Sequence, residues 1–414
     1  MIGLMDCNNF FVSCERLFRP DLLKKPVAVL SSNDGCIVAR SQEIKDLGVP
    51  MGVPYFQVKE VLTKAGATLF SSNFTLYRDI SARVMQTLEK EVGLCEIYSI
   101  DEAFFELRDD VTEAEVLAIR ARIMKEVGLP VSIGISSTKT LAKQASAIAK
   151  SSNGVCILTP TLWQEKISTT PCASVWGLGR KTVAKLRELK ITTVAEFLKL
   201  DRALLRKQFG VMGERVQNEL RGISVYSLGE SHGDIQQSIM STRSFEKNTT
   251  NLHDLESAIG YHVQEVTSQL REQKLLASRM TVLILPSRHG DFFLQQGRKE
   301  VVCIEPTANT QTLLHEALSG IKDIYTKDVP YKKAGIVVSG LIPESQKTDS
   351  LFALKDAQAS SITIDSITDI LNLKFGHGTV RSGIIQKNGA RGSAKLRSKE
   401  YTTNWRDIPT VQAK

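Results

Sequence analysis

The chain has 414 residues, of which 42% are hydrophobic and 24% charged, and its formal net charge is +8. This composition is typical of an ordinary soluble globular protein, and the length predicts roughly three domains. No run approaches the ~18 apolar residues of a membrane-spanning helix, and the sequence opens on a strand-like pattern rather than a signal peptide. We therefore expect a cytoplasmic protein with no membrane partner.

The positions of the cysteines and histidines limit the kinds of catalytic and metal site that the chain can contain. Seven cysteines are scattered without a C-x-x-C pair, which argues against a disulfide framework and against structural zinc. All six histidines lie at or beyond His232. The N-terminal half therefore has no histidine for a general base or a Ser/His triad, which disfavours ordinary hydrolase chemistry there. Metal and carboxylate chemistry remain open to it.

The first part of the chain, to about residue 165, alternates strand-like and helix-like patterns, as an α/β domain does. Residues 1–5 form a short buried-strand pattern that ends on Asp6. Residues 22–70 contain turns of their own and are predicted to form a compact insertion.

The stretch from residue 96 to residue 105 is the most informative in the chain. It is an apolar strand or hairpin pattern interrupted by Asp101 and Glu102. Because neighbouring residues of a flat strand point to opposite faces, both acids can serve one site only at a bend or hairpin tip. Acids beside Ile and Phe are costly to bury unless a cation neutralises them. With Asp6, they supply the three carboxylates that a two-Mg²⁺ site needs, although a solvated Asp-Glu turn is the alternative.

Short helices follow, to about residue 235. Gly177 and Gly179 form a Gly-x-Gly turn just before Lys181 and an amphipathic run, and a second such turn falls at Gly210 and Gly213. Glycines there let backbone N–H groups approach a phosphate at a helix N-terminus. One such turn is most often only a tight turn. Two in one helical segment indicate sequence-independent binding to a DNA backbone.

The last part of the chain begins with a polar linker near 229–235. Alternating patterns around 238–245 and 279–285 predict strands, and a long helix is expected over about 252–272. From Val380 to the end there are eight Lys and Arg against two acids, so most of the net charge lies in this tail. We expect a flexible tail suited to an acidic partner, DNA or protein, with a solvated end as the alternative.

Residues 5–15 and 98–104 closely resemble the signature pair of the Y-family translesion DNA polymerases, with the UmuC-like branch the most similar. The resemblance includes 31–36, 70–73 and 139–143 and extends over essentially the whole chain, more weakly toward the C-terminus. It implies an α/β (α+β) multi-domain right-hand polymerase with a ferredoxin-like palm and an α/β little finger. The implied domains are a palm over 1–165 with fingers inserted at about 22–70, a helix-hairpin-helix thumb over 166–235, a little finger over 236–345 and a basic C-terminal tail over 346–414.

The resemblance implies that Asp6, Asp101 and Glu102 are catalytic and hold two Mg²⁺, with the backbone carbonyl of Cys7 as a further ligand. It also implies that the glycine turns and Lys181 of the thumb contact DNA. The residues expected around the incoming nucleotide are Phe10, Phe11, Arg40, Lys45 and Lys150.

Two of the nucleotide residues have specific expected roles. Phe11 matches the steric gate, an aromatic ring that fills the space of a ribose 2′-hydroxyl and is Tyr in many relatives. Phe10 beside it is expected to pack mainly in the core. Lys150 and Lys45 match triphosphate-contacting positions, and Arg40 is a further candidate.

The function implied is error-prone DNA-directed DNA synthesis past lesions in the SOS response, on primer-template DNA and dNTPs. A processed UmuD-type dimer and a RecA filament are the implied partners. A sliding clamp is a further candidate, but the motif ending in Leu351 and Phe352 has its Gln346 too far upstream. Two alternatives remain: an autonomous DinB-like polymerase, and an inactive helix-hairpin-helix DNA-binding scaffold. The three retained acids argue against the scaffold.

Overall fold

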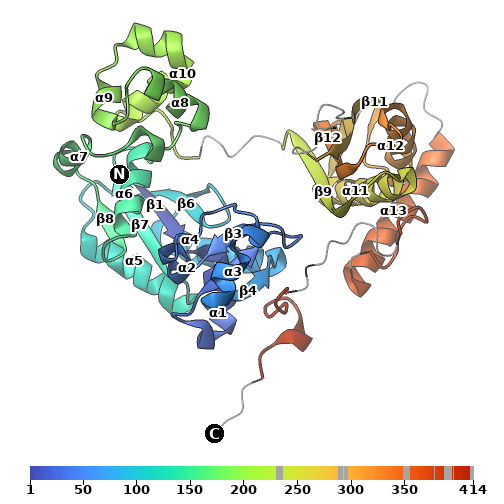
Figure 1. Ribbon diagram of the computed structural model, residues 1–414, viewed down its shortest axis with the longest axis horizontal. Helices are drawn as coiled ribbons and strands as arrows, with labels where there is room; N and C mark the ends of the chain where they lie inside the picture. Colours follow the sequence, from blue (N-terminus) through green and yellow to red (C-terminus); the bar gives the residue numbers. More distant parts are fainter. Residues whose placement is uncertain are drawn as a thin grey trace. The chain divides into compact units, whose positions relative to one another are not determined.

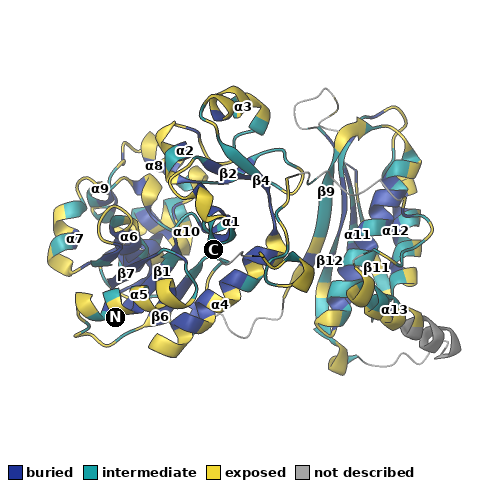
Figure 2. Ribbon diagram, turned by 90° about the horizontal axis from the view of Figure 1, so that it is seen from below, coloured by how far each residue is buried: buried dark blue, intermediate teal, exposed yellow. Residues whose placement is uncertain are grey.

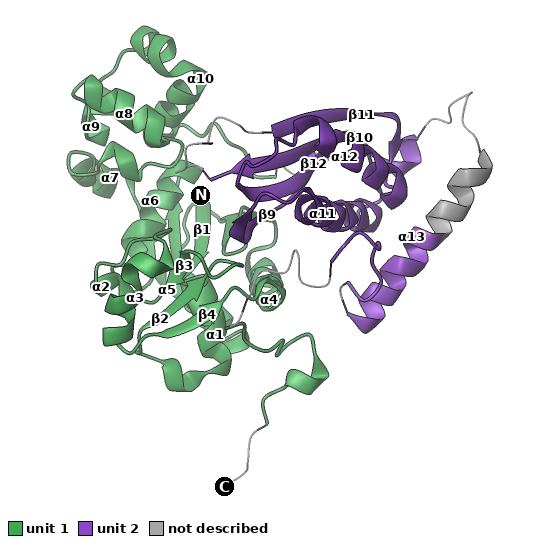
Figure 3. Ribbon diagram, turned by 45° about the vertical axis from the view of Figure 1, so that its right-hand side comes forward, with its two compact units in different colours: residues 1–233, 394–414 green, residues 234–393 purple. Residues whose placement is uncertain are grey.

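The computed structural model describes residues 1–229, 236–287, 292, 297–347, 355–376, 378–386, 394 and 396–410. The chain divides into two compact units, one formed by residues 1–233 with 394–414 and the other by residues 234–393 (Figure 3). Each unit has a hydrophobic core of its own. Among the described residues, no helix is long and apolar enough to cross a membrane.

A five-stranded sheet in the order β5-β6-β1-β7-β8 forms the centre of the first unit. β1 pairs antiparallel with both β6 and β7, and β7 pairs parallel with β8. All six residues of β7 are buried (Figure 2), and its two serines satisfy their hydroxyls by donating to Asn8 Oδ1 and to the Leu158 carbonyl. The strands are β1 (Ile2–Cys7), β5 (Cys95–Ile97), β6 (Glu102–Glu106), β7 (Val131–Ser136) and β8 (Val155–Ile157).

Helices pack on both faces of this sheet (Figure 1). Met5 and Phe105 share a core with three helices, whereas Leu4 and Phe104 on the opposite face pack with Ala142 of a fourth, α6. A Cβ at Gly134 would lie 2.0 Å from the backbone nitrogen of Ser146, so glycine here allows α6 to approach the sheet closely. The four helices are α1 (Phe10–Phe18), α4 (Phe74–Val92), α5 (Glu113–Glu126) and α6 (Lys139–Ala149).

The segment predicted as an insertion contains a three-stranded sheet in the order β3-β2-β4. It has its own core, formed by residues such as Leu30, Ile37 and Leu62. Two helices flank it, α2 (Gln42–Asp46) and α3 (Tyr55–Lys64), and its strands are β2 (Val27–Leu30), β3 (Ile37–Arg40) and β4 (Thr68–Ser71).

A small helical region follows β8 and has another separate core, which includes Trp163, Leu186 and Phe197. Gly210, with φ +65°, interrupts its last helix, so a new helical turn begins just after it. The helices are α7 (Pro160–Lys166), α8 (Arg180–Glu188), α9 (Val194–Leu198) and α10 (Arg202–Leu220).

The second unit is a four-stranded antiparallel sheet in the order β11-β10-β12-β9, with two helices packed on it. The helix expected over 252–272 is confirmed as α11 (Leu252–Glu272), and the two expected strands lie within β9 and β10. The remaining elements are β9 (Ser238–Thr249), β10 (Leu275–Pro286), β11 (Gly297–Thr307), α12 (Thr310–Ile324) and β12 (Tyr331–Pro343).

Two described segments of the C-terminal part make specific contacts that the charge pattern did not predict. Helix α13 (Lys355–Phe375) is held to α11 by a bidentate ion pair, in which the Arg271 guanidinium donates to the two Asp369 oxygens at 2.6 and 2.9 Å. The prediction of a flexible tail is wrong for the stretch from Leu396 to Tyr401, which packs on the first unit. Four of the tail's basic residues lie outside the described residues, as do Leu351 and Phe352 of the clamp motif and the linker residues 230–235.

Candidate active site

Asp6 and Glu102 lie directly opposite one another on neighbouring antiparallel strands. Residues paired in this way have their side chains on the same face, about 5 Å apart at Cβ. That face is the one covered by α6, because Leu4 and Phe104, two residues along each strand, pack against Ala142. Two acids far apart in sequence are therefore brought together by strand register alone.

Asp101 is held at the bend that precedes β6, as the sequence predicted for two adjacent acids that serve one site. Its backbone carbonyl accepts a hydrogen bond from the Cys7 N–H at 2.9 Å. The Ser99 hydroxyl donates to Asp101 Oδ1 at 2.6 Å. The bend thus places Asp101 beside the end of β1, next to Asp6.

Two lysines of α6 and its C-cap neutralise Asp6 and Glu102. Lys150 Nζ lies 2.6 Å from Asp6 Oδ2, and Lys143 Nζ lies 3.0 and 3.2 Å from the two Glu102 oxygens. Lys143 lies within α6 and Lys150 caps its C-terminus, so the seven residues between them put both on the same side of the helix, two turns apart.

The surroundings of the two lysines differ. Lys143 is only 16% exposed, and its ammonium lies 4.4 Å from the ring centre of Tyr98 and 5.7 Å from that of Trp176. Lys150 is 45% exposed. Lys143 is thus fixed by aromatic rings, whereas Lys150 has room to turn toward a ligand. The sequence predicted no role for Lys143: its seven-residue spacing from Lys150 puts both lysines on one side of a helix but does not identify Glu102 as its partner.

The electrostatics of the site centre on Asp6. Burial raises the pKa of Asp6 to about 6, the Lys150 ammonium opposes this rise, and the charges of Glu102 and Asp101 add to it. Burial also raises the pKa of the Cys7 thiol, so the side chain of Cys7 stays a neutral core group. An acid that is desolvated and surrounded by like charge is stabilised by a nearby cation.

The acid cluster fits a divalent metal in its donor atoms. Within the described ranges, no three His, Cys, Asp or Glu side chains form a ready-made metal cluster. The donor set nevertheless suits Mg²⁺, because burial disfavours the charge of Asp6, the charges of Glu102 and Asp101 act on it, and an ammonium already lies on Asp6 and on Glu102. The acids therefore fit a hard divalent cation that replaces or supplements the lysines.

Arg40 and Lys45 lie on the insertion but within electrostatic reach of the site. Burial lowers the pKa of Lys45, the positive charges of Arg40 and Lys150 lower it further, and Asp6 opposes them. The Nε and Nη1 atoms of Arg40 are buried and have no hydrogen-bond partner among the described residues. Three cations thus gather near Asp6, a number that suits a polyanionic ligand better than one carboxylate.

Phe10 and Phe11 begin α1 and have different surroundings. Phe10 is buried in the core at 4% exposure, so its ring is not open to a nucleotide. Phe11 is partly exposed, and its ring stacks on Tyr77 with centres 4.5 Å apart and planes 13° apart. Phe74 meets Phe11 edge-on at 5.7 Å. Phe11 is therefore a partly exposed ring that packs against the rings of Tyr77 and Phe74.

The predicted DNA-contact residues lie in the helical region rather than among the acids. Gly179 caps the start of α8 without a side-chain hydrogen bond, and Lys181 is exposed in the first turn. Because no side chain caps it, the first turn of α8 has free N–H groups that can bind an anion. Gly177, which precedes this turn, has φ +92°, and the neighbouring Trp176 donates from Nε1 to the Tyr98 hydroxyl at 3.0 Å.

The second glycine turn has a similar form. Gly210 breaks α10, and Gly213 lies in the first turn after the break. Gly213 is buried, and a Cβ there would lie 2.5 Å from the Cβ of Phe209. The two turns are alike in backbone form, but Gly213 also serves packing.

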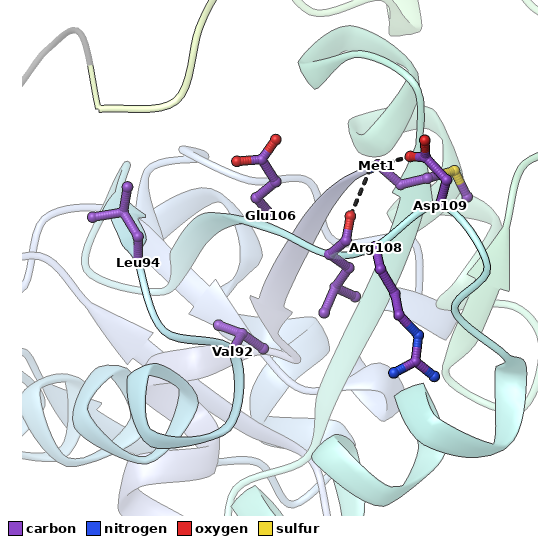
Figure 4. Close-up of a pocket in the computed structure, with 7 residues that line it drawn as sticks. Met1, Val92, Leu94, Glu106, Arg108 and Asp109 are labelled. Atoms are coloured by element: carbon purple, nitrogen blue, oxygen red, sulfur yellow. Dashed lines mark hydrogen bonds and ion pairs between the residues drawn. The ribbon is translucent and has the colours of Figure 1, made fainter.

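A pocket of about 520 Å³ lies at the opposite end of β1 from Asp6 (Figure 4). The Met1 amino group there donates to the Leu107 carbonyl at 2.7 Å and to Asp109 at 2.8 Å. The Asp109 side chain is 94% exposed. With no concentration of buried charge, this hollow has none of the features of the acid cluster, and the candidate active site is at the other end of the strand.

Comparison with solved structures defines the class of fold. The structure matches that of a Y-family DNA polymerase chimera of Dbh and Dpo4, with a TM-score of 0.68, covering 83% of this chain and all of that chain at 19% identity. The α/β fold is thus that of a Y-family polymerase.

Comparison of sequences defines the family. Residues 5–147 match the impB/mucB/samB family, residues 236–351 match the C-terminal domain of that family, and residues 363–411 match a domain of unknown function, DUF4113. The chain is 34% identical to the protein UmuC of Salmonella typhimurium and 32% identical to the protein MucB of Escherichia coli, in both cases over the whole of both chains. It is 26% identical to a DNA polymerase IV of Bacillus velezensis over 92% of each. The chain belongs to the impB/mucB/samB family of Y-family DNA-directed DNA polymerases.

Proposed function

We propose that this chain is an error-prone, UmuC-like polymerase that extends primers past damaged template bases in the SOS response. The observation that carries the proposal is the placement of Asp6, Glu102 and Asp101 at one end of β1, with an ammonium on Glu102 and three further cations near Asp6. A DNA-binding scaffold would have no use for a desolvated acid such as Asp6 at this point, because a buried carboxylate is unfavourable without a cation beside it.

The three acids would hold two Mg²⁺, with the Cys7 carbonyl as a further ligand. When bound, the ions supply activation of the primer 3′-hydroxyl and stabilisation of the leaving pyrophosphate. The protein holds the acids in place beforehand: strand register fixes Asp6 against Glu102, and the Ser99 hydroxyl orients Asp101. No protein nucleophile is required, which is consistent with the absence of histidine from the first 231 residues.

The cations around Asp6 would bind the incoming triphosphate. Lys150 is exposed enough to turn from Asp6 toward a phosphate, whereas Lys143 stays packed between aromatic rings beside Glu102. Lys45 and Arg40 approach from the insertion. Phe11 would act as the steric gate, because its braced ring cannot yield to a ribose 2′-hydroxyl.

The regions of the fold take the expected places in this proposal. The five-stranded sheet would be a ferredoxin-like palm, and the three-stranded sheet the fingers. The helices around α8 and α10 would be a helix-hairpin-helix thumb whose free N–H groups hold the DNA backbone. The antiparallel sheet of the second unit would be the little finger.

Activity in this proposal depends on a processed UmuD-type dimer and a RecA filament. Primer extension across an abasic site, with dNTPs and Mg²⁺, tests the proposal when the protein is assayed with and without these partners. Extension only with both partners supports a UmuC-like subunit, and extension by the protein alone supports the autonomous DinB-like alternative. Bound DNA without extension in either condition would overturn polymerase activity in favour of the scaffold.

A further inference from the structure

The ring that supports Phe11 is itself held by a buried carboxylate. Tyr77, which stacks on Phe11, donates its hydroxyl hydrogen bond to Glu15 Oε1 at 2.6 Å. Glu15 lies on α1, four residues after Phe11, so it belongs to the same helical face as the gate. The position of the Phe11 ring therefore depends on the Tyr77–Glu15 pair.

A residue from the far end of the chain binds the same oxygen. The Ser398 hydroxyl donates to Glu15 Oε1 at 3.0 Å, across 383 residues of sequence. Glu15 is fully buried, and its second oxygen, Oε2, has no hydrogen-bond partner in the described part of the chain. Burial raises the pKa of Glu15, and the Tyr77 and Ser398 hydroxyls oppose the rise. Because these two hydroxyls both bind Oε1, the carboxylate depends strongly on each of them.

We name the stretch from Leu396 to Tyr401 the C-terminal clip, and Asn73 at the start of α4 is its main anchor. The Asn73 amide donates to the backbone carbonyls of Ser398 and Lys399 at 3.2 and 3.1 Å. The Arg397 guanidinium donates to Asn73 Oδ1 at 3.2 Å and to Glu400 at 2.8 Å. Asn73 also caps α4, the helix that carries Tyr77. The clip and the supporting ring are therefore tied to the same helix terminus.

Both ends of the clip are also fixed. Leu396 exchanges hydrogen bonds with Ser71 at the end of β4, at 3.0 and 3.1 Å. Tyr401 stacks on Phe18 at the end of α1, with ring centres 4.5 Å apart and planes 12° apart. The clip thus contacts α1, which carries Phe11, α4, which carries Tyr77, and the end of β4.

We propose that the C-terminal clip is a positioning element for Phe11: by holding Glu15 and Asn73, it fixes Tyr77 and so sets the discrimination between deoxynucleotides and ribonucleotides. This inference rests on the proposed function, which makes Phe11 the steric gate. It gives a role to the end of the segment that matches a domain of unknown function. Ser398 and Arg397 are positioning residues, since neither touches Phe11 itself.

The chain offers matched variants to test the proposal. Ser398→Ala removes the hydroxyl that binds Glu15, and Ser398→Thr restores one. Arg397→Ala removes a positive charge together with its bonds to Asn73. Lys399→Ala removes a positive charge from an exposed side chain two residues away and leaves those bonds in place. The readout is kcat/KM for a deoxynucleotide and for its ribonucleotide counterpart, on undamaged primer-template with all partners present.

Discrimination should fall about three- to tenfold in Ser398→Ala and Arg397→Ala, chiefly through a lower KM for the ribonucleotide. Ser398→Thr and Lys399→Ala should keep the wild-type ratio. A wild-type ratio in Arg397→Ala would overturn the positioning role. Equal losses of kcat/KM for the deoxynucleotide and the ribonucleotide would also overturn it, and would leave the clip with a general structural role only.

Hydrogen exchange provides a second measurement that needs no catalysis. The amides of α1 around Glu15 should exchange faster in Arg397→Ala than in Lys399→Ala. Without the Arg397 bonds to Asn73, the clip is held less firmly, and Ser398 therefore binds the Glu15 carboxylate less often. Unchanged exchange would overturn the inference even if the enzyme proved inactive. If wild-type protein incorporates no nucleotide while exchange changes as expected, the proposed function fails and the clip's hold on α1 stands.

Discussion

Lys143 and Glu102 form a largely buried ion pair, in which Nζ lies 3.0 Å from Oε2 and 3.2 Å from Oε1. The two side chains are 16% and 20% exposed. The pair connects α6 to the hairpin that carries the acids, and rings of Tyr98 and Trp176 enclose the ammonium. Lys143 is therefore a built-in cation for one end of the acid cluster.

Removing this cation should make the protein depend more on divalent metal. We expect Lys143→Ala to lower the free energy of unfolding by about 1–3 kcal/mol in the absence of metal, since Glu102 keeps its burial and loses its partner. Mg²⁺ should then raise the melting temperature more in the variant than in the wild type, because no ammonium competes for Glu102. Thermal unfolding with and without Mg²⁺ measures this, and identical Mg²⁺-dependent shifts would count against shared occupancy of Glu102.

The two adjacent phenylalanines should respond differently to truncation. Phe11→Ala removes a partly exposed ring in front of Tyr77 and should admit ribonucleotides with little loss of stability. Phe10→Ala empties a core position at 4% exposure and should lower the free energy of unfolding by about 3–5 kcal/mol. Incorporation of a ribonucleotide and thermal unfolding of both variants check the prediction. An unchanged dNTP/rNTP preference in Phe11→Ala would remove Phe11 from the gate role.

Lys45 should contribute to nucleotide binding rather than to DNA binding. It lies near Lys150 and Asp6, so Lys45→Ala should raise the KM for the incoming dNTP about tenfold and leave primer-template affinity unchanged. Lys59→Ala is the matched control, because it removes an exposed lysine from α3 of the same insertion. Steady-state kinetics and DNA-binding titrations separate the two effects. An equal rise in KM for both variants would reduce Lys45 to a general surface charge.

The second unit should lose stability as pH falls, through His262. Burial lowers the pKa of His262 to about 4 from 6.5, and the charges of Arg243 and Lys333 lower it further. Its Nδ1 lies 2.8 Å from the Ser241 hydroxyl. Between pH 6.5 and 4 the unfolded chain binds a proton that the folded chain does not, so stability decreases as pH decreases through this window, by about 3 kcal/mol in full.

A glutamine in place of His262 should remove this component. The free energy of unfolding of wild type should fall by about 3 kcal/mol more than that of His262→Gln between pH 7 and 4. His253→Gln provides the control, because the His253 side chain is 60% exposed. Denaturant unfolding between pH 7 and 4 measures the free energy of unfolding of each protein. Parallel pH profiles for wild type and His262→Gln would refute the prediction.

Much of the acid cluster follows from local sequence. An apolar run broken by Asp101 and Glu102 predicts a bend between strands, and the structure confirms β5, the bend and β6 in that order. The place of Asp6 at the end of a buried strand is equally local. Which strand pairs with which is not local, and the sequence pattern alone does not specify the register that puts Asp6 opposite Glu102.

The sequence pattern did not predict the contacts between residues that lie far apart in the chain. Lys143 is recognisable as a partner only once α6 is packed on the sheet, which the glycine at 134 permits. The return of Ser398 to Glu15 has no periodic signal, because single hydrogen bonds across 383 residues leave no trace in hydropathy. The basic composition of the tail predicted flexibility, whereas specific contacts of Arg397 and Tyr401 hold the stretch from Leu396 to Tyr401 in place.

The measurement that most directly tests the central claim is single-nucleotide incorporation by Asp101→Ala, run beside a primer-template binding assay and with all partners present. Asp109→Ala is the control, since it removes an acid that is 94% exposed in the turn after β6, at the opposite end of β1 from Asp6. We predict that Asp101→Ala abolishes incorporation while DNA affinity stays within a few fold of wild type, and that Asp109→Ala behaves as wild type. Undiminished incorporation by Asp101→Ala would contradict a catalytic role for the acid cluster.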